Sequence, residues 1–348
     1  MSSRHPRVTG AIAALAVFAV IAAAGVGAPA MAAPPPDNGK PSPSASATPS
    51  ESAPTPSETT PAPPETTPAP PETTPAPPET TPAPSERAPA PSETQTLTVA
   101  AVGYPKVMAA AGDSITLAYN SAGYGSFPQY SWATGWASTL NSLQQRLQAA
   151  SGTAIAGSNF AQVGANSASL DGQVNSAIGA GADYLTVQIG ANDACTPTVA
   201  GMTSEADYRA RVKAALTKFL AVKTDSRVFV ASIPNLYRMW SLSKNKFGAR
   251  LIWASAKICQ SMLANPTSTT STNEKRRLAV QARVDAYNTI LQAECAALLT
   301  RCTFDDNAVA KYQFTSTHIS TADYFHPSVE GQRVLATIAW AYNPYTSG

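Results

Sequence analysis

The chain of 348 residues has a formal net charge of only +2, and 44% of its residues are hydrophobic. Its basic residues are dispersed except for Lys275-Arg276-Arg277, which we interpret as the solvated first turns of a helix, so charge argues against a nucleic-acid-binding protein. Beyond residue 26 no segment reaches the roughly 18 uninterrupted apolar residues of a spanning helix, so we expect no transmembrane segment in the mature form.

Residues 1–32 have the three parts of a secretory signal peptide. Arg4 and Arg7 make the start positive, residues 12–26 are almost all apolar, and Ala30-Met31-Ala32 is a small-x-small cleavage site. The apolar run is short for a membrane span, and a retained anchor is the alternative. We therefore expect a secreted, extracellular protein.

Residues 33–97 are of low complexity and consist mainly of Pro, Thr, Ser, Ala and Glu. The unit Pro-Ala-Pro-Pro-Glu-Thr-Thr starts at Pro61, Pro68 and Pro75, and the net charge of the segment is −6. Such a segment has too little apolar surface to offset its ordering entropy. Proline makes it an extended, semi-rigid spacer, so we interpret it as a disordered linker that can associate the protein with the cell envelope.

Residues 98–348 carry a net charge of +6 and are numerous enough for one hydrophobic core. We predict strands at 106–111, 155–160, 184–189, 228–233 and 302–304. We predict helices at 136–150, 170–180, 204–222, 274–299 and from 327 onward. This alternation predicts a three-layer α/β/α sandwich with a parallel sheet of about five strands.

A serine follows the first predicted strand closely. Gly112 permits a sharp turn at the end of the strand, and Ser114 comes two residues later. Active sites of open parallel sheets lie at this edge, where backbone N–H groups can stabilise an oxyanion. Ser114 is therefore a candidate nucleophile, and the alternative is that it caps a helix.

Two histidines remain if the signal segment, which contains His5, is removed. His326 follows Asp323 by three residues, so the carboxylate can reach Nδ1 and leave Nε2 as an acceptor for a hydroxyl. Pro327 is suited to begin the terminal helix. The alternative is that Asp323 caps that helix and His326 lies on the surface. His318 has no comparable partner, and we expect it to be structural.

Four motifs at the ends of predicted strands resemble those of the SGNH (GDSL-type) hydrolases, in the order of that family. The chain is particularly similar to secreted actinobacterial lipases and esterases, and the motifs span most of residues 107–342. They are Gly112-Asp113-Ser114, Gly164 after Asn159-Phe160-Ala161, Gly190-Ala191-Asn192-Asp193, and Asp323-Tyr324-Phe325-His326-Pro327.

The resemblance implies the flavodoxin-like hydrolase fold of that family and a role for each matching residue. Ser114 would be the nucleophile, His326 the general base and then acid, and Asp323 the acid that orients the histidine. The oxyanion hole would consist of the backbone N–H groups of Ser114 and Gly164 and the side-chain amide of Asn192. Asp113 and Asp193 are expected to hold local backbone.

The four cysteines of the chain lie in this domain. An even number in a secreted protein favours two disulfides, which Cys195, Cys259, Cys295 and Cys302 can form in three pairings. Cys295–Cys302 would close a short loop, and Cys195–Cys259 would restrain the loop after Asn192. A zinc site is the competing interpretation, but no CxxC or HxxxH spacing occurs, so we expect no metal.

These features together predict a secreted serine esterase or lipase that needs no cofactor and acts as a monomer on carboxylic esters through an acyl-enzyme. Lipid or acyl esters are favoured because aromatic and aliphatic loop residues can line an acyl pocket. An O-deacetylase of plant or cell-envelope glycans is the alternative enzyme, and an inactive hydrolase fold used for binding is the alternative of another class. The loop residues are Tyr119, Tyr124, Phe127, Tyr130, Trp132, Leu236, Tyr237, Met239, Trp240, Phe247, Leu251, Ile252 and Trp253.

Overall fold

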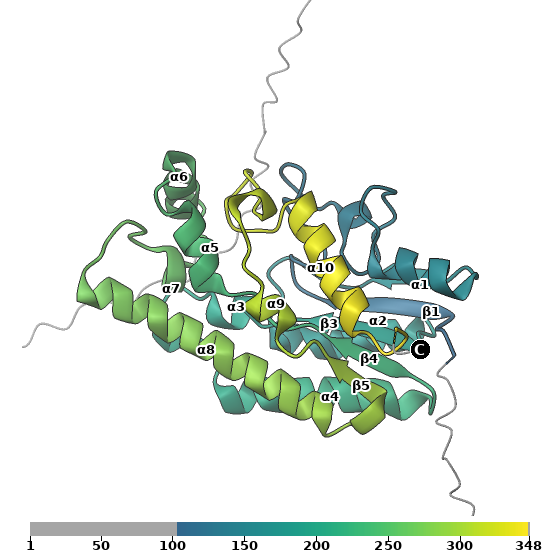
Figure 1. The fold of residues 1–348 in the computed structure, drawn as a ribbon. Helices are drawn as coiled ribbons and strands as arrows, with labels where there is room; N and C mark the ends of the chain where they lie inside the picture. The colour runs from purple at the N-terminus through teal and green to yellow at the C-terminus, as the bar shows by residue number, and fades with distance from the viewer. Residues whose placement is uncertain (1–102, 347–348) are drawn as a thin grey trace, which may run out of the picture. The chain divides into compact units, whose positions relative to one another are not determined.

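The computed structural model describes residues 103–346, so the predicted signal segment and linker lie outside the described residues. Five parallel strands form one sheet in the order β2-β1-β3-β4-β5 (Figure 1). The strands are β1 (Val107–Gly112), β2 (Ala156–Asn159), β3 (Tyr184–Gln188), β4 (Arg227–Val230) and β5 (Cys302–Phe304). The helices are α1 (Leu143–Ser151), α2 (Leu170–Gly179), α3 (Ala191–Ala194), α4 (Glu205–Val222), α5 (Leu236–Ser243), α6 (Phe247–Ser255), α7 (Gln260–Leu263), α8 (Ser271–Ala296), α9 (Ala308–Lys311) and α10 (Val329–Tyr342).

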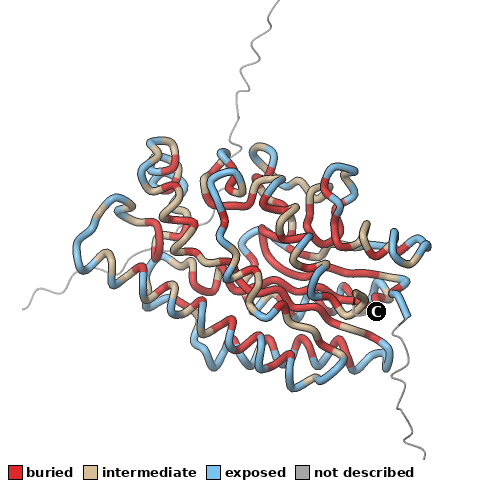
Figure 2. The backbone as a smooth tube through the Cα atoms, viewed as in Figure 1, coloured by how far each residue is buried: buried red, intermediate tan, exposed pale blue. Residues whose placement is uncertain are grey.

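Helices cover both faces of the sheet, which confirms the predicted three-layer sandwich. The helices α1 and α10 pack together on one face, and α2, α4 and α8 lie on the other (Figure 1). The central strands are buried between these layers (Figure 2), and Met108 to Ala111 of β1 have no exposed surface. The direction of strand succession reverses at β1 and β3, so their carboxyl ends border the crevice where such sheets bind ligands.

One predicted helix start is wrong by seven residues, and the predicted starts of α8 and α10 differ from the observed ones by three and two residues. The helix predicted at 136–150 begins at Leu143, because Ser142 accepts a hydrogen bond from the Gln145 backbone and the Gln145 side chain caps Ser142 in return. The residues before it form turns, and Trp136 is 66% exposed. The last helix begins at Val329 instead of residue 327, because Ser328 is its N-cap.

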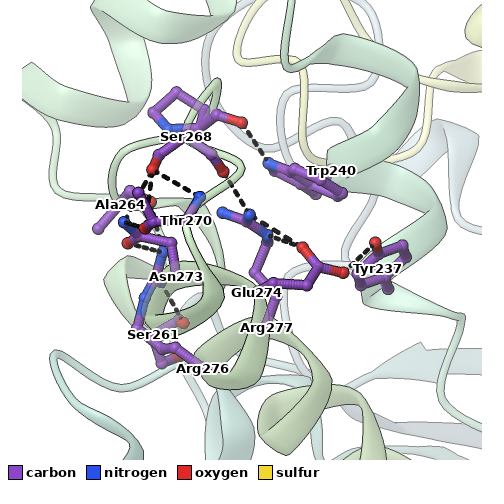
Figure 3. A network of polar contacts seen from close by, with 11 residues as sticks. Tyr237, Trp240, Ser261, Ala264, Ser268, Thr270, Asn273, Glu274, Arg276 and Arg277 are labelled. Atoms are coloured by element: carbon purple, nitrogen blue, oxygen red, sulfur yellow. Dashed lines mark hydrogen bonds and ion pairs between the residues drawn. The ribbon is translucent and has the colours of Figure 1, made fainter.

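The interpretation of the basic cluster as solvated is wrong for two of its three residues. Arg277 is fully buried, with its guanidinium carbon 4.2 Å from the centre of the Trp240 ring, and it bonds to Glu274 and to the Ser268 carbonyl (Figure 3). Arg276 donates to backbone carbonyls of Gln260, Ser261 and Ala264. Both arginines therefore attach the segment between β4 and α8 to the start of α8.

The structure contains two disulfides, and their pairing is one of the three that the sequence allows. Cys195–Cys259 joins the end of α3 to the start of α7, and Cys295–Cys302 links α8 to β5. The first disulfide connects the strand end that carries Asn192 to the segment that carries α5 and α6. Among residues 103–346, no helix has the length and hydropathy needed to cross a membrane.

Candidate active site

The turn after β1 presents Ser114 at the carboxyl edge of the sheet. A Cβ atom at Gly112 would lie 2.5 Å from the Gln188 carbonyl oxygen, so only glycine fits there. The Gln173 side chain holds this glycine by accepting from its N–H at 2.7 Å and donating to its carbonyl at 2.9 Å. Residues 114–120 form turns and no helix, so the N-cap alternative for Ser114 is wrong.

Ser114, His326 and Asp323 lie in one line of hydrogen bonds. His326 Nε2 is 2.7 Å from Ser114 Oγ, and His326 Nδ1 is 2.5 Å from Asp323 Oδ2. The other carboxylate oxygen accepts from the backbone N–H groups of Phe325 and His326, at 2.9 and 3.0 Å. A proton on Nδ1 facing the carboxylate leaves Nε2 as the acceptor for the serine hydroxyl, as nucleophilic catalysis requires.

Asn120 is a further member of this line that the sequence analysis did not identify. Its Nδ2 donates to Asp323 Oδ2 at 2.7 Å, and its side-chain oxygen Oδ1 accepts from the Gly125 N–H at 2.9 Å. Burial alone would raise the pKa of Asp323, but the hydrogen bonds from His326 and Asn120 and the charge of His326 outweigh it and lower the pKa. Asp323 therefore stays a carboxylate opposite the imidazole.

Aromatic rings surround the imidazole and keep it from water. The rings of Tyr119 and Phe325 meet His326 edge to face, with centroids 5.3 and 5.2 Å away. Trp253 of α6 donates from Nε1 to the Asp323 carbonyl at 3.0 Å. Ser114 and His326 are 6% and 8% exposed, so hydrogen bonds among these groups are stronger than they would be in water.

Gly164 lies on the loop after β2, and Asn192 lies in the short helix α3, which directly follows β3. The Gln162 N–H donates to the Gly112 carbonyl at 3.2 Å, which joins the Gly164 loop to the turn before Ser114. Asn192 Nδ2 donates to the Ala165 carbonyl at 2.9 Å, and the second amide hydrogen can be donated to a substrate oxygen. Gly164 has a φ of 77°, and no other heavy atom lies within 4 Å of the position that a Cβ atom would occupy. An approaching ligand therefore meets no side chain there.

The expectation that the two aspartates within the motifs hold local backbone is met by Asp113, whereas Asp193 binds Ser167, which is 26 residues away on the segment after β2. Asp113 accepts from the Ile115 N–H at 2.8 Å, and Asp193 accepts from the Ser167 N–H and hydroxyl at 2.8 and 2.6 Å. Burial raises the pKa of Asp113 to about 7, although the Ile115 hydrogen bond opposes this. In residues 103–346, no three His, Cys, Asp or Glu side chains are grouped as a metal site requires.

His318 makes a local contact, and several of the residues predicted to line an acyl pocket are buried. His318 Nδ1 accepts from the Thr315 backbone at 3.1 Å and closes a local turn, as expected for a structural residue. Five of the residues predicted to line an acyl pocket are buried in the core instead, because their neighbouring helices cover them: Trp132, Leu236, Met239, Trp240 and Trp253. Tyr124, Phe247 and Leu251 are exposed.

A model of the GDSL-like lipase/acylhydrolase family matches residues 110–334. Similar solved structures include an extracellular lipase from Streptomyces rimosus, 19% identical, covering 68% of this chain and 100% of that chain, with a TM-score of 0.41. A mutant acetylxylan esterase from Geobacillus stearothermophilus is 15% identical, covering 71% and 99%, with a TM-score of 0.43. A lipase from a goat rumen metagenome is 16% identical, covering 68% and 96%, with a TM-score of 0.41. Among curated proteins none matches this chain.

Proposed function

The chain belongs to the GDSL-like lipase/acylhydrolase family of carboxylic ester hydrolases, and we propose that it is a serine esterase with Ser114 as nucleophile. The observation that supports this role is the 2.7 Å separation of Ser114 Oγ from His326 Nε2, with Asp323 bonded to the other ring nitrogen. A serine hydroxyl needs an adjacent base to become a useful nucleophile, and the imidazole is placed to be that base.

In the proposed reaction, His326 accepts the Ser114 proton while Oγ attacks the ester carbonyl carbon. The carboxylate of Asp323 stabilises the imidazolium that forms. Collapse of the tetrahedral intermediate breaks the bond to the alcohol oxygen, which takes the proton from His326. Water then attacks the acyl-enzyme, with His326 as base, and releases the carboxylic acid and the free serine.

The negative oxygen of the tetrahedral intermediate needs donors that are already oriented. We assign this task to the backbone N–H groups of Ser114 and Gly164 and to the Asn192 amide. The Ala165 carbonyl holds the Asn192 amide at 2.9 Å, so the donor is fixed before substrate binds. Preorganised donors of this kind typically contribute about 10²–10³ in turnover each.

We propose lipid or other acyl esters as the substrates and secretion as the destination. Tyr124, on the loop that follows β1, and Phe247, the first residue of α6, are exposed apolar side chains on the segments that follow the carboxyl ends of β1 and β4. Two disulfides in the domain suit an oxidising compartment outside the cell. These observations favour acyl esters over the acetylated glycans considered above.

Initial rates on p-nitrophenyl esters from acetate to palmitate test this proposal, with Ser114→Ala as the key variant. The expected result is loss of hydrolysis in Ser114→Ala but not in Ser176→Ala, which removes an exposed hydroxyl on α2. Longer acyl chains should be preferred to acetate. An acetate-only enzyme that deacetylates glycans would favour the alternative substrate, and a wild-type protein inert on every ester would refute the proposal.

A further inference from the structure

Helix α6 exposes an apolar stripe to solvent. Phe247, Leu251 and Ala254 recur at helical spacing on its outer side, and the first two are 74% and 58% exposed. The opposite side of the helix buries Ala249 and Trp253 against the domain. A surface helix packs on the core through one apolar face, and Ala249 and Trp253 provide that face in α6. The outer stripe is therefore not needed for packing α6 on the domain.

The outer stripe lies close to the candidate active site. The inner side of α6 contacts the loop that carries Asp323 and His326, through the hydrogen bond from Trp253 to the Asp323 carbonyl. A Cβ atom at Gly248 would lie 2.8 Å from the Tyr324 hydroxyl, so the first turn of α6 also packs on this loop. Figure 1 shows α6 at the end of α5, standing away from the sheet.

The charges around α6 have one sign. Residues 235–273 contain five basic side chains and no carboxylate, and Arg250 and Lys257, in and just after α6, are exposed. The loop after β1 contains no charged residue between Asp113 and Arg146. Residues 307–329 contain one carboxylate, Asp323, which is buried. No acidic side chain of these segments therefore opposes an anion at the exposed face of α6.

We propose that the outer stripe of α6 docks on an anionic lipid surface, an inference that rests on the acyl-ester function proposed above. Phe247 and Leu251 would enter the headgroup boundary, as the apolar face of an interfacial helix does. Lys246, Arg250 and Lys257 would contact lipid phosphates around it. Docking in this orientation brings the loop that carries His326, and with it Ser114, to the surface that holds the ester substrate.

Co-sedimentation with vesicles tests this docking, using the processed protein without the predicted signal segment because its apolar run would bind lipid itself. The vesicles contain phosphatidylcholine alone or mixed with phosphatidylglycerol, whose anionic headgroup gives the surface a negative potential. The test variants are Phe247→Ser/Leu251→Ser and Arg250→Glu/Lys257→Glu. The matched control is Leu278→Ser/Leu299→Ser, which removes two apolar side chains that are 52% and 78% exposed elsewhere.

The wild type and the control should bind the anionic vesicles at least tenfold more tightly than the neutral ones. Phe247→Ser/Leu251→Ser should lose roughly tenfold or more in vesicle affinity. Arg250→Glu/Lys257→Glu should lose about fivefold for each positive charge removed, and more for the reversal. Both variants should keep the wild-type rate on a soluble short-chain ester, because the changed side chains form no hydrogen bond with Ser114, His326 or Asp323. They should hydrolyse an ester held in vesicles more slowly than the wild type.

Ser114→Ala separates this inference from the proposed function, since it should bind vesicles as the wild type does without hydrolysing ester. Loss of hydrolysis together with normal vesicle binding in Ser114→Ala would therefore agree with both the proposed function and the proposed docking. Equal binding to neutral and anionic vesicles, or undiminished binding of Phe247→Ser/Leu251→Ser, would overturn the docking. So would a wild type that ignores vesicles but forms a dimer, by light scattering, that Phe247→Ser/Leu251→Ser converts to monomer.

Discussion

Replacing Asn120 by aspartate converts a hydrogen-bond donor beside Asp323 into a second carboxylate of the same size. In the wild type, Asn120 Nδ2 donates to Asp323 Oδ2 at 2.7 Å, and the same oxygen lies 2.5 Å from His326 Nδ1. Asn120 has a φ of 57°, a conformation that aspartate also adopts readily. The backbone conformation at residue 120 should therefore be unchanged, while Asp323 faces a carboxylate in place of a hydrogen-bond donor.

The size of the effect follows from the hydrogen bond that is lost. A hydrogen bond to a charged group contributes about 1.5–3 kcal/mol, and two carboxylates in contact do not both ionise, so Asp323 would share a proton. A neutral Asp323 stabilises the His326 imidazolium poorly. At about 1.4 kcal/mol per tenfold change in rate, kcat should fall about 10- to 100-fold. KM should stay within about twofold, because the change acts through Asp323 and not on the bound ester.

Steady-state rates on a soluble short-chain p-nitrophenyl ester measure this, normalised to the active sites counted with a phosphonate titrant. Asn141→Asp is the matched control, because Asn141 is exposed and has the same φ of 57°. An Asn120→Asp enzyme with wild-type kcat would refute the positioning role of Asn120. So would an equal fall in Asn141→Asp, or an effect confined to KM.

Three further changes test other parts of the structure. Asn192→Ala should lower kcat by about 10²–10³ with little change in KM, and an effect on KM alone would contradict its place in the oxyanion hole. Burial raises the pKa of Asp113 to about 7, so the folded protein keeps a proton on Asp113 that the unfolded chain releases above pH 3.8. The contribution of Asp113 to the free energy of unfolding is therefore full below pH 4 and is lost as the pH rises to about 7. Asp113→Asn should remove that loss of about 4 kcal/mol, raising Tm over the wild type at pH 8 but not at pH 4. Cys→Ser variants that lack Cys195–Cys259, which closes a loop of 64 residues, should lose about 4 kcal/mol of unfolding free energy in thermal unfolding. Variants that lack Cys295–Cys302, whose separation is 7, should lose about 2–3 kcal/mol. The reverse order would contradict the loop-length argument.

Features that depend on neighbouring residues were predictable from the sequence. Asp323 and His326 are three residues apart, and a single turn is enough to bring the carboxylate to Nδ1. The capping box that starts α1 was also present in the sequence as Ser142 and Gln145, although apolar residues before it favoured an earlier start. Local chemistry of this kind needs no knowledge of the rest of the fold.

Features that depend on tertiary contacts were not predictable. Asn120 is 203 residues from Asp323, and an isolated asparagine in a loop has no property that indicates such a partner. Arginine is seldom fully buried without a partner, so Arg277 was expected in solvent. It is buried because Trp240 and the Ser268 carbonyl, on other segments, give its guanidinium a ring to stack on and an acceptor.

The distance between Ser114 and His326 is maintained by a contact outside the three residues themselves. The two residues are 212 positions apart, yet α10 begins three residues after His326. Gln332, in the first turns of α10, donates to the Ile115 carbonyl at 2.8 Å and accepts from the Trp132 N–H at 3.0 Å. The helix after the histidine is thus bonded to the residue after the serine. Because Gln332 is fully buried, water does not compete for these hydrogen bonds, and they connect the turn that carries Ser114 to the helix that follows His326.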